Sequence, residues 1–574
     1  MIQKKWIVAE DPPPDQVAHL AAKLGVSLLV AKILLQRDTG APEQANLFLN
    51  PQLTDLTEPT IFPDMEKAID RIISAINGSH HIMIHGDYDV DGVTSTSLLY
   101  LTLQKLGAVV SYYIPNRLSS GYGLSETSVG AAVHRGCKLL ITVDCGITAA
   151  KEIDLANQMG IDTIVTDHHE FQNVDIAAYA VINPKALPPD NPAYFLAGVG
   201  VAFKLVQGVY YRLGYKLSDL IPYLDLVAMG TVADLVPLIN ENRVLSRFGI
   251  KQLANCVNPG LQALLDVTGL RRRQLTTGQL VFVIAPRINA VGRLGDAQLA
   301  VRLFTTKNPQ QALNIARTLE EKNRRRRSID EETFQDAYRI IEQDVDVENV
   351  SVIVLASENW HQGVIGIVAS RIVEKYHRPT VMISIDPKKK IGKGSARSVE
   401  GFHLFNALKQ CEEYMDGFGG HKYAAGLTIH PDKINLFREA LEKVAGAYFS
   451  TEDTTPKLRI DCEINPDEID DHLMKNMKKL APFGPENMRP VLLSKGMNIV
   501  GSPTVVGNNH LKFRVRKQNL THEAIAYRMA DQYYDQLQFE RPRLNLAYVL
   551  DENEWRGRKT IQLRIKGIKF YDDF

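Results

Sequence analysis

Three carboxylates and one imidazole lie within the seven residues from His85 to Asp91, where the sequence is His-Gly-Asp-Tyr-Asp-Val-Asp. Crowded carboxylates repel one another and lose hydration when they are buried, so the fold must offset that cost with bound cations or leave the charges in water. Residues 81–84 are typical of a short buried strand, and residues 93–106 are typical of a helix. Acids in a turn from a strand to a helix lie at the carboxyl end of the strand, where open α/β sheets bind ligands. The stretch therefore favours bound cations, with a solvated acidic turn as the alternative.

Two further expected strands end in side chains of the same kinds. The strand expected at Leu139–Asp144 ends in a carboxylate, and the strand expected at Thr163–Asp167 is followed by His168 and His169. One carboxylate at a strand end is commonly a helix cap, but capping explains three such ends poorly. Because parallel strands bring their ends together, these residues would supply nitrogen and oxygen ligands for two divalent ions. The expected ligand set contains no thiolate, which favours Mn²⁺ or Mg²⁺ over structural zinc.

The sequence around these residues alternates between strand-like and helix-like segments from residue 82 to residue 236. The expected strands are Ile82–His85, Val109–Ile114, Leu139–Asp144 and Thr163–Asp167, with helices such as Leu124–Arg135 and Ala149–Gly160 between them. Alternation of this kind predicts an α/β domain with a parallel sheet that is covered on both faces.

Length and composition restrict the class of protein. A chain of 574 residues is expected to form three or four domains. The 66 basic and 66 acidic residues balance, so any site for a polyanion must be local. The five cysteines are scattered, which argues against a disulfide framework and fits a reducing cytoplasm. No leader-like apolar segment and no run of 18 apolar residues occurs, so secretion and membrane insertion are disfavoured.

The remaining sequence divides into a lead-in and three later segments. Residues 1–50 have helical apolar spacing, and we expect them to pack on the domain that follows. Residues 308–343 predict a long, highly charged helix that leads into a second α/β unit from about residue 350. After a polar linker at 451–456, the pattern predicts the short strands of a small β-barrel.

Several stretches resemble motifs of the DHH phosphoesterase superfamily, and the likeness is greatest to its bacterial exonucleases specific for single-stranded DNA. The matching stretches are Asp89-Val90-Asp91, Val143–Gly146, Asp167–His169, Leu196–Phe203, Asp225–Pro237, Ala285–Arg293, Trp360–Gly366 and Gly419–His421. A lone Asp-His-His triplet would be weak evidence, whereas several motifs in the family's order are specific. The resemblance implies a helical lead-in (1–50), a DHH metal-binding domain (51–305), a connecting helix (306–347), a DHHA1-like α/β domain (348–450) and an OB-fold barrel that binds single strands (456–574).

The resemblance also implies how the cations are held. One ion would be bound by His85, Asp89 and Asp144, and the other by Asp91, Asp144, His168 and an acid from residues 224–235. Two acids are available in that stretch. We prefer Asp234, because it completes the Gly-x-x-x-Asp pattern of other family members, and Asp225 is the alternative.

Three of these residues would take part directly in the reaction, namely Asp144, His168 and His169. Asp144 would bridge the two ions, and His169 would contact the substrate phosphate. Asp87 and Asp167 are expected to hold neighbouring ligands in place rather than to bind metal.

Five residues are expected to bind substrate: Arg117, Tyr122, Arg287, Ser395 and Arg397. Arg287 is one of two arginines separated by small residues, a pattern that suits phosphate contacts better than a core. Arg117 could grip a terminal phosphate and Tyr122 could stack on a base, with an ordinary surface loop as the alternative. Ser395 and Arg397 lie two residues apart in a basic stretch and would point the same way from an extended segment. A plain basic hairpin is the alternative there.

In the expected barrel, five basic residues and no acid lie between Lys495 and Lys517. Together with Phe513 and Tyr527, they could line a groove for a single strand. The surface of a generic β-domain would look similar.

These expectations combine into one function. The chain would degrade single-stranded DNA from the 5′ end, release nucleoside 5′-monophosphates, and act as a cytoplasmic monomer in DNA repair and recombination. A helicase and a single-strand-binding protein are the expected partners. The alternatives are a DHH phosphodiesterase of small substrates, such as dinucleotides or oligoribonucleotides, and an inactive DHH scaffold that only binds single strands.

Overall fold

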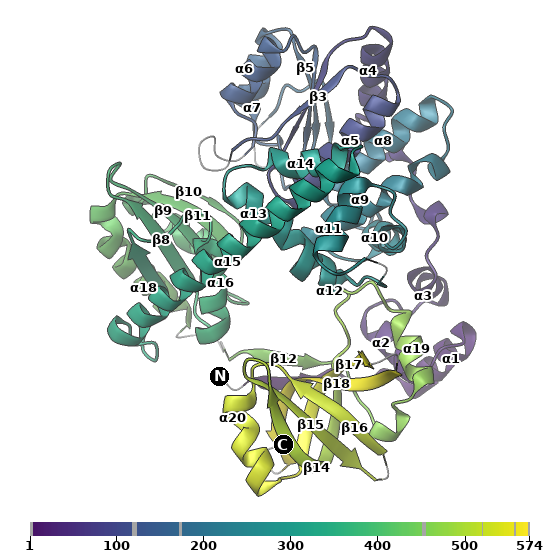
Figure 1. Cartoon of the computed structure of the whole chain (residues 1–574), viewed down its shortest axis with the longest axis vertical. Coiled ribbons are helices and arrows are strands. Elements are labelled where there is room, and N and C mark those ends of the chain that lie inside the picture. Colours follow the sequence, from purple (N-terminus) through teal and green to yellow (C-terminus); the bar gives the residue numbers. More distant parts are fainter. Residues whose placement is uncertain are drawn as a thin grey trace. The chain divides into compact units, whose positions relative to one another are not determined.

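The computed structural model describes residues 4–116, 123–171, 175–271, 273–449, 455–518, 520–555 and 558–571. The chain forms two compact units, coloured along the sequence in Figure 1. The first unit comprises Asn50–Arg327 and Ala481–Met488, and the second comprises Met1–Leu49, Ser328–Leu480 and Arg489–Phe574. One boundary between the units falls inside the long helix α15 (Pro309–Asp344), which confirms the long helix expected there.

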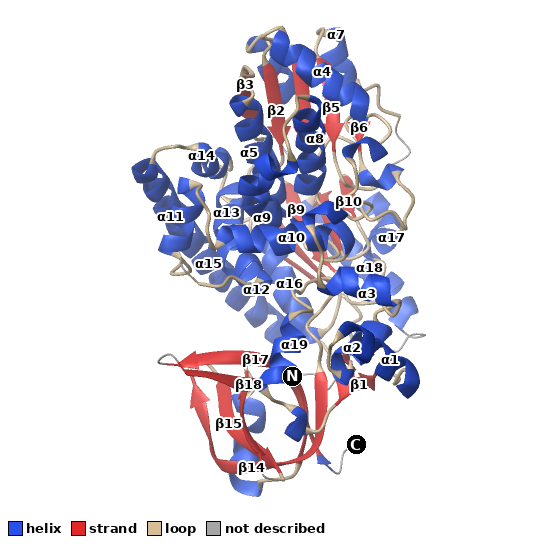
Figure 2. Ribbon diagram, turned by 90° about the vertical axis from the view of Figure 1, so that its right-hand side faces the viewer, coloured by secondary structure: helices blue, strands red, loops and turns tan. Residues whose placement is uncertain are grey.

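A five-stranded parallel sheet lies inside the first unit (Figures 1 and 2). In hydrogen-bonding order its strands are β3 (Val110–Tyr113), β2 (Ile82–Gly86), β4 (Leu139–Val143), β5 (Asp162–Thr166) and β6 (Ala180–Ile182). The four expected strands are therefore confirmed to within two residues, and β6 was not expected.

Helices cover both faces of this sheet because successive strand residues point to opposite sides. Ile82 and Ile84 pack into the core formed with α4 (Met65–Asn77), α5 (Val90–Lys105) and α8 (Gly198–Arg212). Met83, between them, packs on the other face against α6 (Glu126–His134) and α7 (Ala150–Gln158).

A helical layer completes the first unit. Its helices are α9 (Leu224–Ala233), α10 (Asn240–Leu253), α11 (Pro259–Val267), α12 (Thr277–Gln279), α13 (Ala285–Arg293), α14 (Gln298–Thr305) and the first part of α15, with a π-helical segment at Leu280–Ile284. Leu226, Leu264, Ile288 and Phe304 lie in the apolar core that joins these helices.

Residues 481–488 return to this first unit from the C-terminal part of the sequence. The guanidinium group of Arg243 on α10, which is buried, donates to the backbone oxygens of Ala481 and Pro482 at 3.0 and 3.3 Å. The backbone N–H of Leu238 donates to the backbone oxygen of Pro485 at 2.9 Å. A short piece of the C-terminal sequence is therefore built into the domain that carries the expected cation site.

The second unit contains the second α/β domain. Its sheet has the order β10 (Gly417–Gly420), β11 (Ala424–Ile429), β9 (Ile391–Arg397), β8 (Thr380–Asp386) and β7 (Ile353–Ser357). Only β7 and β8 are parallel, and they are connected through α16 (Ile365–Tyr376). The other helices are α17 (Leu404–Lys409) and α18 (Ile434–Phe449).

The second part of α15 packs on this domain rather than standing alone as a connector. The Arg371 guanidinium on α16 lies 3.8 Å from the ring centre of Phe334, and the Lys375 ammonium lies 3.5 Å from that of Tyr338. Trp360 Nε1 donates to a carboxylate oxygen of Asp336 at 2.8 Å. These contacts make residues 328–344 a structural part of the second α/β domain.

The C-terminal strands close into a five-stranded barrel, as the sequence predicts. The closed strands follow the order β14 (Leu492–Val506), β15 (His510–Lys517), β16 (Leu520–Ala526), β18 (Arg558–Phe570) and β17 (Leu544–Trp555), and β17 pairs with β14. A short strand β13 (Cys462–Glu463) pairs in parallel with the start of β14, and helices α19 (Asp471–Lys478) and α20 (Ala530–Asp535) flank the strands.

The N-terminal residues differ from the expectation. They form α1 (Pro14–Leu24), α2 (Leu28–Gln36) and α3 (Pro42–Leu49), but also a strand β1 (Lys5–Val8) that pairs in parallel with β12 (Lys457–Ile460). The side-chain amide of Gln36 also donates to the backbone oxygen of Asp461 at 3.0 Å. The segment belongs to the unit that contains the barrel, and its packing on the following domain stays a prediction.

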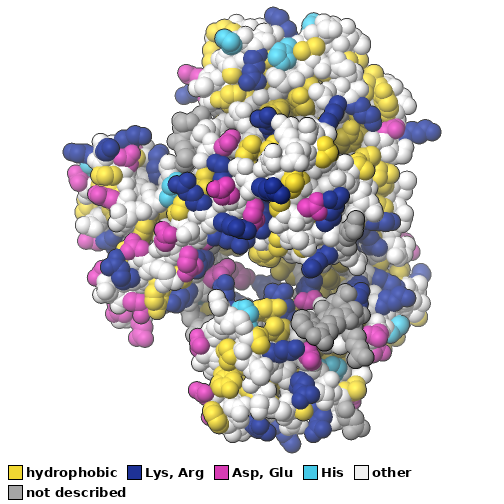
Figure 3. All heavy atoms as spheres, viewed as in Figure 1, with side chains coloured by type: hydrophobic (Ala, Val, Ile, Leu, Met, Phe, Trp, Pro, Cys, Tyr) yellow, Lys and Arg dark blue, Asp and Glu magenta, His cyan; other side chains and the backbone are white. Residues whose placement is uncertain are grey.

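Basic and acidic side chains are intermixed on the face drawn in Figure 3, as the balanced composition predicts. Among the described helices, none alone is long and apolar enough to cross a bilayer, and the bent pair α1 and α2 meets the length and composition criteria only when joined.

Candidate active site

Three adjacent strands deliver the expected acids and histidines to one edge of the first sheet. Asp87, Asp89 and Asp91 follow β2, Asp144 follows β4, and the Asp167–His169 triplet follows β5. Since β4 lies between β2 and β5, the three turns are neighbours. Asp234, the C-cap of α9, joins them from the helical layer.

These residues come close enough to hold metal ions. Three groups have ligand atoms within 4.8 Å of one another: Asp87, Asp89 and Asp144; Asp91, His168 and Asp234; and Asp144, His168 and His169. The Nε2 atom of His168 lies 3.1 Å from Asp144 Oδ1, 3.6 Å from Asp234 Oδ2 and 4.0 Å from Asp91 Oδ2. Asp144 thus stands between the first group and the second, as a bridging ligand would.

Asp144 has an unusual backbone conformation. Its φ of 60° lies in the left-handed region, which non-glycine residues rarely adopt, and its N–H donates to the backbone oxygen of Thr166 at 3.0 Å. Strand β4 ends at Val143, one residue before the expected end, and the Asp144 side chain is 4% exposed. Strain held by the surrounding structure is typical of functional sites.

Asp167 organises the turn that contains both histidines. Its Oδ1 atom accepts from the backbone N–H groups of His168 and His169 and from Nδ1 of His169 at 2.7 Å, and its Oδ2 atom accepts from the N–H of Ile147. Burial disfavours the charged His169 ring, but the hydrogen bond and charge of Asp167 outweigh burial and raise the pKa of His169. Asp167 therefore supports its neighbours, as the sequence predicts, and favours a protonated His169.

The electrostatics of the cluster call for a cation. Burial, followed by the charge of Asp89, raises the pKa of Asp91 to about 7, and burial with the neighbouring acids raises the pKa of Asp144 and of Asp234 well above the usual range. Burial lowers the pKa of His168 to about 3, so its ring is neutral and does not balance the carboxylates. Carboxylates and a neutral imidazole are the ligand types that divalent cations such as Mn²⁺ bind, so the residues present fit such ions.

The geometry separates the two acids of the stretch 224–235. Asp234 lies in the cluster, whereas Asp225 belongs to none of the ligand groups found among the described residues. Asp225 Oδ1 accepts from the N–H of Leu226 at 2.8 Å, and burial raises its pKa to about 7. The position of Asp234 beside Asp91 and His168 therefore favours Asp234 over Asp225 as the ligand.

Two further residues of the Asp-rich turn, His85 and Asp87, bear on the expected ligand sets. His85 is fully buried in β2 and stacks on Tyr113 with ring centres 5.7 Å apart, and among the described residues it joins no ligand group. Burial lowers its pKa to about 4. Asp87, expected only to support other ligands, lies with Asp89 and Asp144 in one group instead. Asp87, Asp89 and Asp91 alternate along the chain. This regular spacing was the signal in the sequence that could have named Asp87 as a candidate ligand.

Of the three substrate-binding residues expected in the first unit, the structure describes only Arg287. Arg117 and Tyr122 lie outside the described residues. Arg287 on α13 is 7% exposed, its Nε atom lies 2.5 Å from Glu320 Oε2 on α15, and its Nη1 atom donates to the backbone oxygen of Val283. These contacts hold two helices together, so the proposed phosphate contact of Arg287 stays a prediction.

In the second unit, Ser395 and Arg397 do point the same way from β9. Arg397 Nη1 donates to Ser395 Oγ at 3.1 Å. Both side chains approach the backbone of Gly366 in the first turn of α16 closely. A Cβ atom added to this glycine would lie 2.7 Å from Ser395 Oγ and 2.8 Å from Arg397 Nη2. A guanidinium group, a hydroxyl and a helix N-terminus therefore meet at one place, which is a combination that suits an anion.

Phe513 and Tyr527, the two aromatic residues expected to line a groove in the barrel, differ in exposure. Phe513 is 2% exposed and lies inside the barrel, so the expectation that it lines a groove was wrong. The alternation of Leu511, Phe513 and Val515 in β15, all of them buried, could have shown this. Tyr527 is 45% exposed, next to the His510 ring and with the Arg564 guanidinium 5.1 Å from its ring centre.

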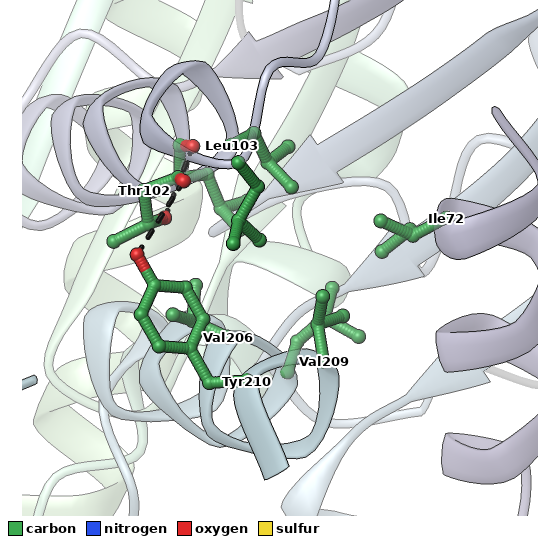
Figure 4. Close-up of a pocket in the computed structure, with 9 residues that line it drawn as sticks. Ile72, Thr102, Leu103, Val206, Val209 and Tyr210 are labelled. Atoms are coloured by element: carbon green, nitrogen blue, oxygen red, sulfur yellow. Dashed lines mark hydrogen bonds between the residues drawn. The ribbon is translucent and has the colours of Figure 1, made fainter. Parts of the chain in front are cut away.

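A separate apolar pocket in the first unit is not part of this site. It lies between α4, α5 and α8 and is lined mainly by aliphatic side chains such as Ile72, Leu103, Val206 and Val209 (Figure 4). The Tyr210 hydroxyl donates to the backbone oxygen of Thr102 there at 3.5 Å. The pocket is at the C-terminal ends of α5 and α8, whereas the acids gather at their N-terminal ends, so it is a feature of the core.

The sheet, the acid and histidine edge and the second α/β domain define a DHH phosphoesterase. The model of the DHH family N-terminal domain matches residues 81–231, and the DHHA1 domain model matches residues 349–447. The model of the RecJ OB domain matches residues 460–567. The chain belongs to the RecJ family.

Curated relatives and solved structures agree along most of the chain. The single-stranded-DNA-specific exonuclease RecJ of Bacillus subtilis is 35% identical over 98% of this chain and 70% of its own length. The protein of that name from Escherichia coli is 34% identical over 88% of this chain and 90% of its own length. The crystal structure of RecJ from Thermus thermophilus in complex with Mn²⁺ matches with a TM-score of 0.84 and 28% identity, covering 98% of this chain and 79% of that one. A second crystal structure of that protein is in complex with Mg²⁺.

Proposed function

We propose that this chain is an exonuclease that hydrolyses single-stranded DNA from the 5′ end and releases nucleoside 5′-monophosphates, with two Mn²⁺ or Mg²⁺ ions as cofactors. Membership in the RecJ family supports the substrate class, the reaction and the choice of metals. The observation that carries the proposal is the group of buried acids and histidines at three adjacent strand ends, with Asp144 shared between two ligand groups.

Particular residues would hold the cations. Asp87 and Asp89 would hold one ion, Asp91, His168 and Asp234 the other, and Asp144 both. Bound divalent ions lower the pKa of water and neutralise charge on a phosphodiester during in-line attack.

The protein's own side chains orient the substrate phosphate. Asp167 fixes the ring of His169, whose side chain is 35% exposed, so a protonated imidazole is available at the rim of the acid cluster. A positively charged donor there would bind a non-bridging phosphate oxygen and balance the negative charge that develops during the reaction. His169 would therefore act on substrate and His168 on metal, as the resemblance implies.

Recognition of the 5′ end is assigned to the second α/β domain. Ser395, Arg397 and the N-terminus of α16 would bind a terminal phosphate, which offers more charge and more acceptor oxygens than an internal one. Arg117, Tyr122 and Arg287 remain predicted substrate contacts.

We also propose partners and a cellular role for this activity. An enzyme that cuts only single strands needs another activity to expose them, so a helicase and a single-strand-binding protein are the expected partners. We expect the enzyme to act as a monomer in the cytoplasm, in DNA repair and recombination.

The decisive experiment digests single-stranded DNA labelled at one end or the other, with Mn²⁺ and with an excess of chelator. We expect mononucleotides to be released first from the 5′ end, no cleavage with chelator, and no cleavage by a folded Asp144→Ala variant. Release from the 3′ end would contradict the polarity. Cleavage restricted to dinucleotides or short RNA would favour a small-substrate phosphodiesterase, and binding without cleavage would favour an inactive scaffold.

A further inference from the structure

The first turn of α8 is capped by a carboxylate from another element. Helices leave their first N–H groups unpaired, and a side chain at the N-cap usually accepts from them. The N-cap of α8 is Ala197, which has no such side chain. Instead, the N–H of Gly198 donates to Asp91 Oδ2 at 2.7 Å, and the N–H of Val199 donates to Asp91 Oδ1 at 2.8 Å. Both oxygens of Asp91 are therefore oriented by the backbone of α8.

This helix also approaches Asp144 closely. A Cβ atom at Gly198 would lie 2.7 Å from Asp144 Oδ1 and 2.8 Å from Asp144 Cβ, closer than real Cβ atoms come. Residue 198 thus lies beside both acids, hydrogen-bonded to one and in contact with the other. A side chain at this position would have to displace Asp144.

A second glycine confines Asp91 from the opposite helix. A Cβ atom at Gly230 on α9 would lie 2.8 Å from Asp91 Oδ1 and 2.3 Å from the hydroxyl of Thr94. Asp91 is therefore held between the first turn of α8 and the middle of α9. Its side chain is fully buried, so it has no room to relax toward solvent.

We propose that Gly198 and Gly230 are positioning residues of the metal centre, which set the orientation of Asp91 and its separation from Asp144. The inference rests on the proposed function, because it assumes that these two acids bind metal. Gly198 belongs to the motif Leu196–Phe203, and Gly230 belongs to the motif Gly230–Asp234, which also contains the expected ligand Asp234. The proposal therefore gives each motif a role in positioning metal ligands. Groups that orient metal ligands typically change metal affinity 10- to 100-fold when they are altered.

Other glycines of α8 provide matched controls. A Cβ atom at Gly200 would first meet the Cδ2 atom of Leu196, and one at Gly208 would first meet the Cδ1 atom of Ile69. Both are ends of flexible apolar side chains, which can move away. Gly200→Ala therefore makes the same chemical change in the same helix without touching an acid.

The test measures Mn²⁺ binding by titration calorimetry in the full chain, for wild type, Gly198→Ala, Gly230→Ala and Gly200→Ala. Circular dichroism and the metal-free Tm establish that each variant is folded. We expect Gly198→Ala and Gly230→Ala each to weaken Mn²⁺ binding by tenfold or more, and Gly200→Ala to stay within twofold of wild type. Because Gly230 lies on a different helix, it tests the proposal independently if the Gly198 variant fails to fold.

Two results would overturn the inference in distinguishable ways. Affinity within twofold of wild type in a folded Gly198→Ala or Gly230→Ala protein would refute the positioning role and leave the proposed function intact. Absence of Mn²⁺ binding by the wild-type chain would refute the metal centre, and with it both proposals.

Discussion

Asp225 and Asp234 show how surroundings separate two acids that lie nine positions apart in one motif. Asp234, at the end of α9, faces other carboxylates and His168. Asp225, in the first turn of the same helix, is buried without a nearby charge partner among the described residues, and no described group accepts or donates at its Oδ2 atom. A carboxylate among other carboxylates is stabilised by a cation, whereas an isolated buried carboxylate is best kept protonated.

This difference predicts how each acid contributes to metal binding. Asp234→Asn removes a charged ligand, so we expect Mn²⁺ affinity to fall by about tenfold or more. Asp225→Asn is the matched control and should bind Mn²⁺ within twofold of wild type. Titration calorimetry on both proteins gives the answer, and the opposite order of affinities would identify Asp225 as the ligand.

Asp225 should also make stability depend on pH. Its pKa is about 7 in the folded chain and near 4 in the unfolded chain, so the folded state binds the proton more tightly and loses stability as pH rises from about 4 to 7. Asp225→Asn lacks this loss. We expect the variant to match wild type at about pH 4 and to exceed it by roughly 2–4 kcal/mol at about pH 8. Thermal unfolding at both pH values, without metal, measures the difference; an equal offset at both would contradict it.

At the scale of elements, strand and helix ends carry the chemistry in both α/β domains. In the first unit, parallel strands gather acids at their carboxyl ends, where adjacent loops leave room for ligands. In the second unit, the N-terminus of α16 meets Ser395 and Arg397 of the antiparallel strand β9. The carboxyl ends of the parallel strands therefore gather negative charge that suits cations, and the N-terminus of α16 gathers positive charge that suits an anion.

The second of these ends predicts discrimination between 5′-terminal groups. A charge-assisted hydrogen bond contributes roughly 1.5–3 kcal/mol, so Arg397→Ala should reduce the preference for 5′-phosphorylated over 5′-hydroxyl strands by about ten- to a hundredfold. Lys393→Ala removes the same charge from the same strand and should change the preference little. Ratios of kcat/KM for the two substrates test this, and an unchanged ratio in the Arg397 variant would show that the phosphate is recognised elsewhere.

At the scale of the whole molecule, the order of the sequence and the division into units do not coincide. Residues 4–49 join the unit of the barrel through β1 and β12, and residues 481–488 join the unit of the metal site through Arg243. The loop supported by that segment, which includes Leu238, directly follows Asp234. A truncation meant to remove only the barrel should therefore end after Met488, because an earlier end also removes part of the first unit.

The segment 481–488 should contribute measurably to the stability of the first unit. Arg243→Ala removes the guanidinium donor of the Ala481 carbonyl and one of the two donors of the Pro482 carbonyl, which keeps the side-chain amide of Asn487. The change also creates a cavity, so we expect a loss of about 2–5 kcal/mol. Arg247→Ala, one turn further along α10, is the control with a less buried side chain. Calorimetric unfolding of the full chain measures both, and equal transitions for wild type and Arg243→Ala would show that the segment is only loosely attached.

Much of the site was determined by the sequence alone. The strands that end at Gly86, Val143 and Thr166 follow from short apolar runs, and the acids and histidines after them follow directly in the chain. Patterns of this kind depend on neighbours a few residues away, because side-chain direction repeats every two residues in a strand. The division into two α/β domains and a barrel follows from the same local periodicities.

Only the tertiary structure decided how distant segments meet. It placed Asp87 in one group with Asp89 and Asp144, and among the described residues it placed Asp234 but neither Asp225 nor His85 in such a group. It also turned Phe513 into the barrel and paired Arg287 with Glu320. It also brought residues 481–488 to Arg243. Spacing along the chain says nothing about such contacts, because they depend on the angles at which whole elements pack and on the free energy of burying each charged group beside a particular partner.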